Sequence, residues 1–207
     1  MANSTAHERQ AFGLTILKNS HSDIRRLRRE AGYPSIHGNK FWKSTYLLMD
    51  YLQEFPPAKG ARILEIGCGW GLAGIYCAKR FKANVTALDA DKTVFPYLEL
   101  HAQLNGVSIE TWQCRYERIT KADLAHFDLV IGADVCFWDT MIAPLYNLTR
   151  RAAQVGNVRV VMTDPGRPTF SAMAEKCMEK LGAEYDNWAV PHPNNASGLV
   201  MDLKAVK

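Results

Sequence analysis

Three glycines and two carboxylates carry the clearest chemical signal in this sequence. Gly67, Gly69 and Gly71 lie close together, Glu65 precedes them, and Asp89 follows further along the chain. The glycines permit a tight turn with the backbone close to a ligand, because no Cβ stands in the way. Glu65 repels the pyrophosphate of a dinucleotide and favours a cationic or amino-bearing ligand. The five residues therefore predict a site for a nucleotide-like ligand that is not a dinucleotide.

A strand, a turn and a helix are needed to position these residues. The apolar run Ile63–Ile66 predicts a buried strand of a parallel sheet, and a helix resumes after the glycines, at about Leu72–Phe81. Asn84–Asp89 reads as the next strand and ends in its acid. The end of that strand is where a carboxylate meets the hydroxyls of a ribose.

The segment Glu65-Ile66-Gly67-Cys68-Gly69-Trp70-Gly71 resembles the first motif of the class I, seven-strand S-adenosylmethionine methyltransferases. The resemblance runs from about residue 36 to the C-terminus. It implies S-adenosylmethionine as the cofactor, S-adenosylhomocysteine as the product, and no metal. It assigns the amino group of the cofactor to Glu65 and the ribose to Asp89. The cofactor contacts that it implies are Trp42, Glu65, Gly67, Cys68, Gly69, Gly71, Asp89, Ala90, Tyr116 and Ala133.

Two later motifs narrow the resemblance. Asp134-x-x-Phe137 followed by the run Asp164–Pro168 is similar to the group that contains the lysine methyltransferase of the electron transfer flavoprotein β-subunit and predicted nicotinamide N-methylases. Related protein-lysine enzymes commonly have Tyr where Phe137 stands. The resemblance implies N-methylation, of a protein lysine or of a small heterocycle.

Asp134 and Phe137 are the predicted catalytic residues. The strand before Asp134 is apolar at Leu129–Ile131, so it is central and its end opens into the ligand crevice. The next three residues, Val135–Phe137, offer no side-chain cation to pair with Asp134. We therefore expect Asp134 to orient the acceptor amine.

Three groups of residues near the acceptor allow two interpretations each. Phe137 and Trp138 form an apolar wall or pack the base of the next helix. Trp42 touches the cofactor or anchors its own helix. Asp164 and Arg167 pair as a structural turn or bind a substrate carboxylate.

The contact to adenine stays open. Relatives often carry an acid just after the third strand, whereas this chain reads Cys114-Arg115-Tyr116-Glu117. Either Glu117 takes that role or stacking and backbone contacts hold the adenine.

The predicted fold is α/β: a Rossmann-like seven-stranded, mostly parallel sheet with an antiparallel C-terminal hairpin, helices on both faces and an N-terminal helical lid. A single domain, residues 1–207, divides into a helical extension, 1–57, and a cofactor-binding core, 58–207. Residues 1–21 show no clear period. The two helices of the predicted lid run from Ser22 to Gly32 and Pro34, and from Phe41 to Phe55, with Ser35–Lys40 between them. The further predicted strands span 108–114, 127–133, 158–163, 184–190 and 198–206.

The composition indicates the cellular compartment of the protein. No apolar run is long enough to span a bilayer, and the chain reads as globular and soluble. The five cysteines contain no C-x-x-C pair, which favours reduced thiols in the cytoplasm over disulfides or zinc. His101 lies in a helical pattern and reads as a satisfied surface or groove residue rather than a ligand.

A basic segment precedes the glycine turn. Nucleic acid or an acidic protein could bind it, but no aromatic residues interleave the arginines, so we expect a solvated helix face. The predicted partner is a protein or small-molecule methyl acceptor, with no nucleic acid, no membrane and a monomeric chain. An NAD-linked oxidoreductase, which Glu65 disfavours, and a non-catalytic binding module are the alternatives. The charged residues of this segment are Lys18, Arg25, Arg26, Arg28, Arg29, Lys40 and Lys43, against Asp23 and Glu30.

Overall fold

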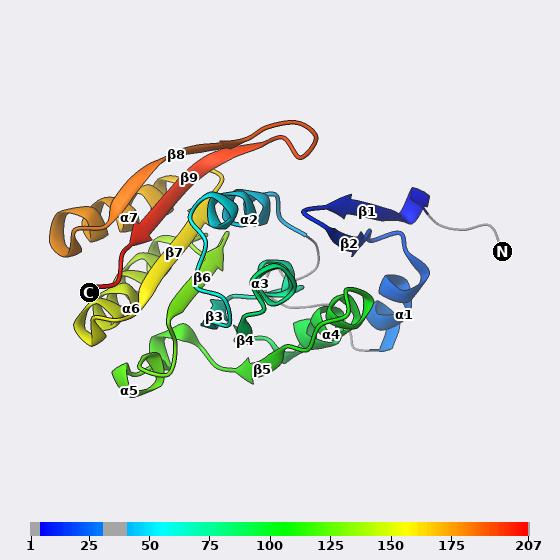
Figure 1. The fold of residues 1–207 in the computed structure, drawn as a ribbon, viewed down its shortest axis with the longest axis horizontal. Helices are drawn as coiled ribbons and strands as arrows, with labels where there is room; N and C mark the ends of the chain where they lie inside the picture. Colours follow the sequence, from blue (N-terminus) through cyan, green and yellow to red (C-terminus); the bar gives the residue numbers. More distant parts are fainter. Residues whose placement is uncertain (1–4, 31–40, 207) are drawn as a thin grey trace.

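A seven-stranded sheet forms the centre of the molecule (Figure 1). The structure is a computed structural model that describes residues 5–30 and 41–206. The strand order across the sheet is β5-β4-β3-β6-β7-β9-β8. In chain order the strands are β3 (Arg62–Ile66), β4 (Asn84–Asp89), β5 (Glu110–Gln113), β6 (Leu129–Ala133), β7 (Arg159–Asp164), β8 (Glu184–Val190) and β9 (Ala196–Leu203).

The first five of these strands run parallel, and only β9, which lies between β7 and β8, runs in the opposite direction. β9 pairs antiparallel with β7, and β8 pairs antiparallel with β9. Residues 191–195 connect β8 to β9 directly, so the two strands form a hairpin; a parallel pair needs a long crossover. The predicted fold class, a mostly parallel sheet with an antiparallel C-terminal hairpin, is confirmed.

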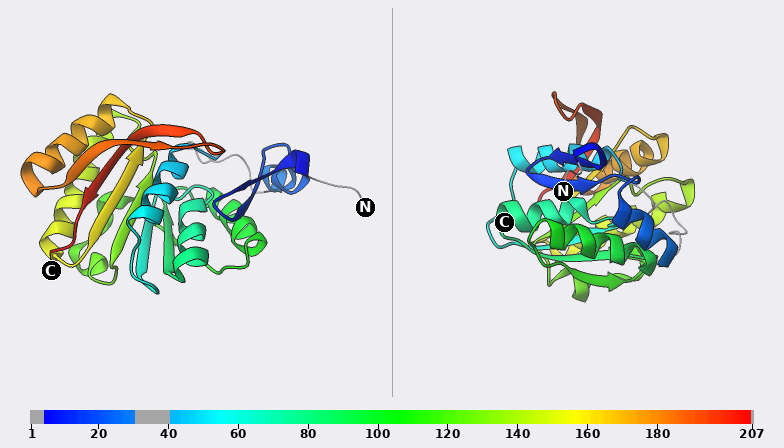
Figure 2. Two further views of the ribbon diagram at one scale, coloured as in Figure 1. Left: turned by 45° about the horizontal axis from the view of Figure 1, so that its top comes forward. Right: turned by 90° about the vertical axis from the view of Figure 1, so that its right-hand side faces the viewer.

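Helices cover both faces of the sheet (Figure 2). Neighbouring residues of β3 show why: Ile63 belongs to a core cluster with residues of α2, α3 and α4, whereas Leu64 belongs to a cluster with residues of α5, α6 and α7. Successive side chains of a strand point to opposite faces, so a strand apolar at both positions needs cover on both. The helices are α1 (Ser22–Glu30), α2 (Ser44–Glu54), α3 (Leu72–Phe81), α4 (Phe95–Leu104), α5 (Lys121–Leu124), α6 (Ile142–Val155) and α7 (Pro168–Leu181), with short 3₁₀ turns η1 (Thr5–His7), η2 (Lys92–Val94), η3 (Tyr116–Arg118) and η4 (Asp139–Met141).

The N-terminal region contains a β-hairpin that the sequence did not predict. β1 (Glu8–Ala11) pairs antiparallel with β2 (Leu14–Leu17) across a two-residue turn. Phe12 and Gly13 both have positive φ, 52° and 73°, which is the geometry of a tight hairpin turn. The expectation of an irregular segment is therefore wrong for the described residues 5–21. The proposed extension, 1–57, is likewise not purely helical.

Helix α4 fixes this hairpin through two buried polar side chains. The Asn105 side chain accepts a hydrogen bond from Thr15 N and donates one to Thr15 O, both at 2.9 Å. His101 Nε2 accepts from Leu17 N at 3.2 Å, and its Nδ1 is 2.7 Å from Tyr97 O. His101 is fully buried. The prediction of a surface or groove position is therefore wrong, whereas its hydrogen bonds are satisfied as expected.

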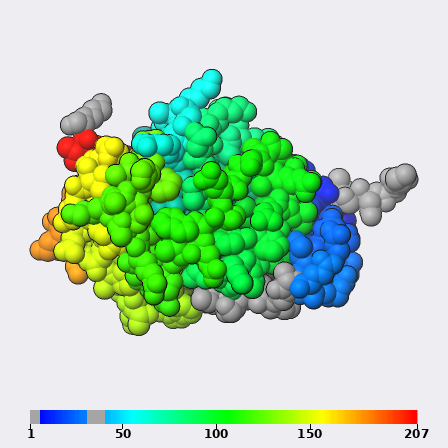
Figure 3. Space-filling model, turned by 90° about the horizontal axis from the view of Figure 1, so that it is seen from below, coloured from blue at the N-terminus to red at the C-terminus, as the bar shows by residue number. Residues whose placement is uncertain are grey.

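The predicted helical lid is corrected by the packing. Most of α2 is buried against α3, β7 and β9, so this helix belongs to a layer of the fold rather than to a lid. α1 packs on α4, at the opposite end of the molecule from β8 and α7 (Figure 3). The predicted end of the first helix at Gly32 and Pro34, and the connection 35–40, lie outside the described residues.

The arginines of α1 face outward in part. Arg25, Arg26 and Arg29 are exposed, and Arg26 pairs with Asp23 at 3.2 Å. Lys40, which the sequence grouped with them, lies outside the described residues. Among the residues that the structure describes, no helix is both long and apolar enough to cross a membrane.

Candidate functional site

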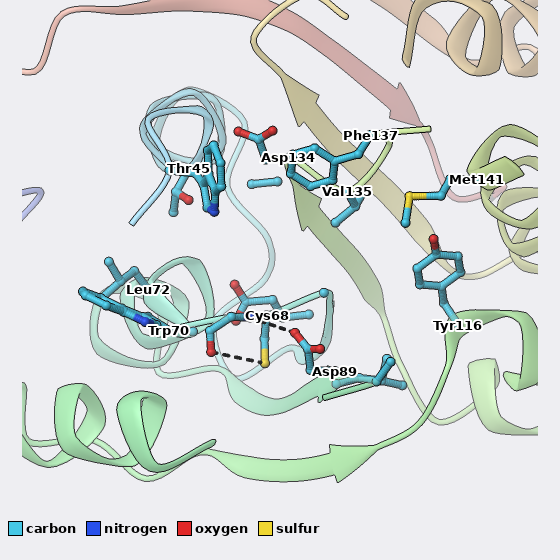
Figure 4. Close-up of a pocket in the computed structure, with 18 of the residues that line it drawn as sticks. Thr45, Cys68, Trp70, Leu72, Asp89, Tyr116, Asp134, Val135, Phe137 and Met141 are labelled. Atoms are coloured by element: carbon cyan, nitrogen blue, oxygen red, sulfur yellow. Dashed lines mark hydrogen bonds between the residues drawn. The ribbon is translucent and has the colours of Figure 1, made fainter. Parts of the chain in front are cut away.

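A pocket opens at the carboxyl ends of β3, β4 and β6 (Figure 4). The chain passes from β3 through β4 to β5 in one direction and then returns to the other side of β3 with β6. Ligands of open α/β sheets bind at such a reversal of strand order. The residues predicted to contact the cofactor or to act in catalysis all line this pocket: Trp42, Glu65, Gly67, Cys68, Gly69, Gly71, Asp89, Ala90, Tyr116, Ala133, Asp134 and Phe137.

The glycine turn forms the floor of the pocket between β3 and α3. Gly67, Gly69 and Gly71 all have positive φ, at 59°, 52° and 67°, which favours glycine. A Cβ on Gly67 would come within 2.8 Å of Val135, and one on Gly71 within 2.4 Å of Leu98. A Cβ on Gly69 would meet nothing within 4 Å. Two of the glycines are therefore needed for close packing, and the third faces open space.

Glu65 lies buried beside the N-terminal turn of α3. Its Oε2 accepts a hydrogen bond from Gly74 N at 3.1 Å. A Cβ on Gly74 would stand 2.5 Å from the same oxygen, so this approach requires glycine. Burial raises the pKa of Glu65 to about 8, and the nearby Asp89 carboxylate adds to the rise. Ionised Glu65 in this position calls for a cation.

Asp89 ends β4, as predicted, and holds the turn beside it. Its Oδ2 accepts from Gly69 N at 3.1 Å, and its Oδ1 accepts from Asp91 N at 3.0 Å. Burial raises its pKa above the ordinary value. A carboxylate has about four acceptor sites, so two backbone donors leave room for the hydroxyls of a ligand.

Asp134 has partners that sequence reasoning missed. Its Oδ2 accepts a hydrogen bond from Ser44 Oγ, and its Oδ1 forms an ion pair with Arg167. The three residues after Asp134 offer no cation, as the sequence showed, but Arg167 supplies one from a distant segment. Parallel pairing of β6 with β7, which places Ala133 opposite Thr163, brings the segment with Arg167 to Asp134.

In the turn after β7, Asp164 and Arg167 pair with each other, which is the structural one of the two interpretations given above. Arg167 Nη1 lies 2.8 Å from Asp164 Oδ2. The backbone N–H groups of Gly166 and Arg167 also donate to Asp164 Oδ1, at 2.9 and 2.7 Å. The Asp164 side chain is thus fully engaged in its own turn.

Aromatic rings flank Asp134. Phe137 lies edge-on to Trp42 with the ring centroids 5.6 Å apart, and both line the pocket. Figure 4 shows Asp134 between Thr45 and Phe137, at the other end of the pocket from Asp89. Trp138 is 47% exposed, and it is not one of the described residues that line the pocket. The two ends of the pocket therefore differ: polar near Asp89, aromatic near Asp134.

Sequence reasoning missed several lining residues. Trp70 lies in the glycine motif itself and stacks on Tyr97, with the ring centroids 5.8 Å apart. Glu117, considered for the adenine, lines the pocket and pairs with Arg115 at 3.5 Å. Most of the missed residues lie close in sequence to a predicted residue, and this proximity was the only signal that could have identified them. The lining residues outside the prediction are Phe41, Thr45, Trp70, Leu72, Leu88, Arg115, Glu117, Val135 and Met141.

Acidic side chains dominate the charge of the pocket. Four acids line it, Glu65, Asp89, Glu117 and Asp134, against one base, Arg115. The described residues hold no group of three or more side chains able to bind a metal. This surplus of carboxylates opposes polyphosphates and favours a cation.

Comparisons with known proteins agree with this geometry. A family model described as lysine methyltransferase matches residues 21–179. The electron transfer flavoprotein β-subunit lysine methyltransferase of Rattus norvegicus is 25% identical over 80% of this chain and 64% of its own length. A ubiquinone biosynthesis O-methyltransferase of Cereibacter sphaeroides is 35% identical over 62% of this chain and 49% of its own length. The chain thus spans about half to two thirds of these curated relatives.

Solved structures share the fold. The tRNA (uracil-54, C5)-methyltransferase of Pyrococcus abyssi, in complex with S-adenosyl-L-homocysteine, has a TM-score of 0.61 at 17% identity, over 94% of this chain and 42% of its own. The ribosomal protein L11 methylase of Lactobacillus delbrueckii has a TM-score of 0.58 at 17% identity, over 80% and 79%. At these identities the likeness shows the fold alone. With the family model matching most of the chain, this protein belongs to the lysine methyltransferase family and has the class I methyltransferase fold.

Proposed function

We propose that this protein transfers a methyl group from S-adenosylmethionine to the side-chain nitrogen of a protein lysine. The observation that carries the proposal is the pocket at the strand-order reversal, where the glycine turn lies between Glu65 and Asp89 and acids outnumber bases. The family match and the flavoprotein-methylating relatives support nitrogen as the acceptor atom.

The residues at the polar end fit this cofactor. Glu65 is a buried carboxylate that the cofactor's ammonium group would neutralise, and Asp89 retains acceptor sites for the ribose. Gly69 faces open space, where the backbone can approach the ligand. When bound, S-adenosylmethionine supplies a methyl group already activated by its sulfonium centre. The protein's own task is to align the nucleophile and exclude water.

The aromatic end fits an amine. Trp42 and Phe137 provide apolar walls, and Asp134 provides a carboxylate among them. An apolar surrounding lowers the pKa of a lysine, so that its ammonium group can release a proton to solvent before the neutral amine accepts the methyl group. Asp134 binds and orients that amine. We also propose a cytoplasmic location, supported by five cysteines that form no disulfide.

One experiment tests both the identity of the cofactor and the class of the methyl acceptor. Calorimetry should show binding of S-adenosylmethionine and S-adenosylhomocysteine and no comparable binding of NAD, because Asp89, Glu117 and Asp134 outnumber the single base of the pocket and oppose a pyrophosphate. The protein is then incubated with S-adenosylmethionine tritiated in the methyl group, using a cell lysate and, separately, the recombinant β-subunit of an electron transfer flavoprotein. Label that survives in protein hydrolysates as methyllysine supports the proposal. The proposal is contradicted if NAD binds more tightly than S-adenosylmethionine and S-adenosylhomocysteine. It is also contradicted if the label appears only in small molecules or in hydroxyl groups.

Replacing Asp134 by Asn tests its assigned role. The Asn side chain keeps the shape and the contact to Ser44 but removes the charge that faces the amine. Turnover in single-turnover methyl transfer should fall roughly 30- to 1,000-fold, about 2–4 kcal/mol, while cofactor affinity is spared. Because Arg167 loses one counter-charge, the melting temperature is recorded alongside. Full turnover, or loss of cofactor binding with acceptor binding intact, would show that Asp134 has another role.

A further inference from the structure

One guanidinium lies between two buried carboxylates at the aromatic end of the pocket. Arg167 Nη1 contacts Asp164 Oδ2 at 2.8 Å and also forms the ion pair with Asp134 Oδ1. The side chain of Asp164 is fully buried, and that of Asp134 is 3% exposed. Asp134, Asp164 and Arg167 form a trio of charged side chains. With both acids ionised, this trio has a net charge of minus one.

The two carboxylates differ in the hydrogen bonds they have left to accept. Asp164 takes two backbone donors and the Arg167 side chain, so its capacity is largely used. Asp134 has two donors only in the described part of the chain: Ser44 Oγ donates to its Oδ2, and Arg167 pairs with its Oδ1. Asp134 is also the member of the pair that lines the pocket. The acid with fewer donors is therefore the one that lines the pocket.

Arg167 also fixes the wall beside Asp134. Its guanidinium carbon lies 4.3 Å from the centre of the Phe137 ring, a cation–π contact. Ser44, the other partner of Asp134, is anchored to β7 because its carbonyl accepts from Thr163 Oγ1 at 2.9 Å. Both groups that face the acceptor, Asp134 and Phe137, thus depend on the position of one arginine.

We propose that Arg167 is a positioning residue that holds Asp134 and Phe137 in place, and that the remaining negative charge of the trio selects an acceptor arriving as an ammonium cation. The inference rests on the proposed methyl transfer and extends it to the way the site distinguishes an amine from a hydroxyl. Arg167 itself does not touch the acceptor.

The first test compares Arg167→Gln and Arg167→Lys with the wild type. The acceptor is the protein that takes up label in the lysate experiment. In Arg167→Gln, kcat should fall about 100-fold through misalignment, while the KM for the acceptor does not rise, since no attractive charge has been removed. Arg167→Lys keeps the positive charge and should recover part of kcat. The Kd for S-adenosylhomocysteine should stay within about twofold, because Arg167 lies at the other end of the pocket.

Arg150→Gln is the matched control, because Arg150 is exposed on α6 and does not line the pocket. It should behave as the wild type in every assay. Melting temperatures of all variants separate lost positioning from lost fold. If Arg167→Gln does not fold, the intermediate kcat expected of Arg167→Lys carries the test.

The second test addresses charge selection with two competing probes of similar shape. At pH 7.5, n-butylamine is a cation, whereas 1-butanol is neutral. The amine should inhibit methyl transfer at concentrations at least about tenfold lower than the alcohol, the ratio that one favourable charge contact gives.

The outcomes separate this inference from the function it rests on. A wild type that binds no S-adenosylhomocysteine and labels no protein overturns both. A wild type that methylates protein while Arg167→Gln keeps its kcat, or raises KM at constant kcat, overturns the inference alone, the second result meaning that Arg167 grips the acceptor directly. Equal inhibition by n-butylamine and 1-butanol overturns the charge selection.

Discussion

At the residue scale, the buried acids of the pocket matter through their protonation. Glu65 has its pKa raised to about 8 by burial, so its carboxyl is mostly protonated at neutral pH. A ligand ammonium beside it favours the ionised form. Binding of such a ligand therefore releases a proton from Glu65.

This proton release predicts a pH dependence of cofactor affinity. The Kd for S-adenosylhomocysteine should fall as the pH rises from 6 towards 8, by up to about tenfold per pH unit, because fewer protons must then be displaced. Glu65→Gln should remove this slope and weaken binding by about 1.5–3 kcal/mol. Calorimetry at several pH values measures both effects.

Glu117→Gln is the control for that series. Glu117 also lines the pocket but is exposed. Its variant should keep the slope of the wild type. A slope that persists in Glu65→Gln would mean that another group takes up the proton.

At the element scale, the N-terminal hairpin depends on one neutral histidine. Burial lowers the pKa of His101 to about 4, although the hydrogen bond to Tyr97 opposes that shift. Nε2 must remain unprotonated to accept the N–H of Leu17 on β2. Protonation of His101 would therefore loosen β2 from α4.

Acid should consequently destabilise the protein through His101. The unfolded chain binds a proton here at about pH 6.5 and the folded chain only at about pH 4. The contribution to the free energy of unfolding is therefore complete above pH 6.5 and is lost as the pH falls towards 4, by about 3 kcal/mol. Urea unfolding at pH 7 and pH 4.5 measures the loss.

Two variants isolate this contribution. His101→Phe should be less stable at pH 7 and should lose less on acidification than the wild type. His192→Gln replaces an exposed histidine and should leave the pH dependence unchanged. An equal acid loss in wild type and His101→Phe would assign the effect to other groups.

At the scale of the whole molecule, one buried acid joins the C-terminal hairpin to the rest of the fold. Asp202 on β9 accepts hydrogen bonds from Tyr51 of α2 at 2.9 Å and from Arg159 of β7 at 2.7 Å. Lys204 also pairs with it. Burial alone would raise the pKa of Asp202, but Arg159 and Lys204 hold it below the ordinary value.

Asp202→Asn should destabilise the protein by about 3 kcal/mol at pH 7, because Arg159 would be left with a neutral partner in a mostly buried position. The loss should shrink at low pH, where the wild-type contribution fades as Asp202 becomes protonated. Denaturant unfolding checks the stability. The Kd for S-adenosylhomocysteine should not change, since none of these groups lines the pocket. Unchanged stability would mean that the desolvation free energy of the ion pairs of Asp202 equals their favourable electrostatic free energy.

The same buried cluster shows why strand order could not be read from the chain alone. Arg159 and Asp202 lie far apart in sequence and meet because β7 and β9 are antiparallel neighbours. Short patterns define a strand by its alternation, but they do not state which strand lies beside it.

The sequence by itself determined the features that depend on local backbone chemistry. The apolar run before Gly67, the positive φ of the three glycines and the acid at the end of β4 all follow from residues within one βαβ unit. Such units are encoded locally, because glycine conformation and strand alternation do not require distant contacts. The direct connection between β8 and β9 predicted their antiparallel pairing for the same reason.

Tertiary structure alone decided the environment of each charged group. Ser44 and Arg167 reach Asp134 from α2 and from the turn after β7, and His101 is buried because β2 covers it. These contacts join segments whose separation is set by sheet register and helix packing, which no local pattern contains. The sequence could therefore predict twelve of the residues that line the pocket, whereas the partners of Asp134 required the fold.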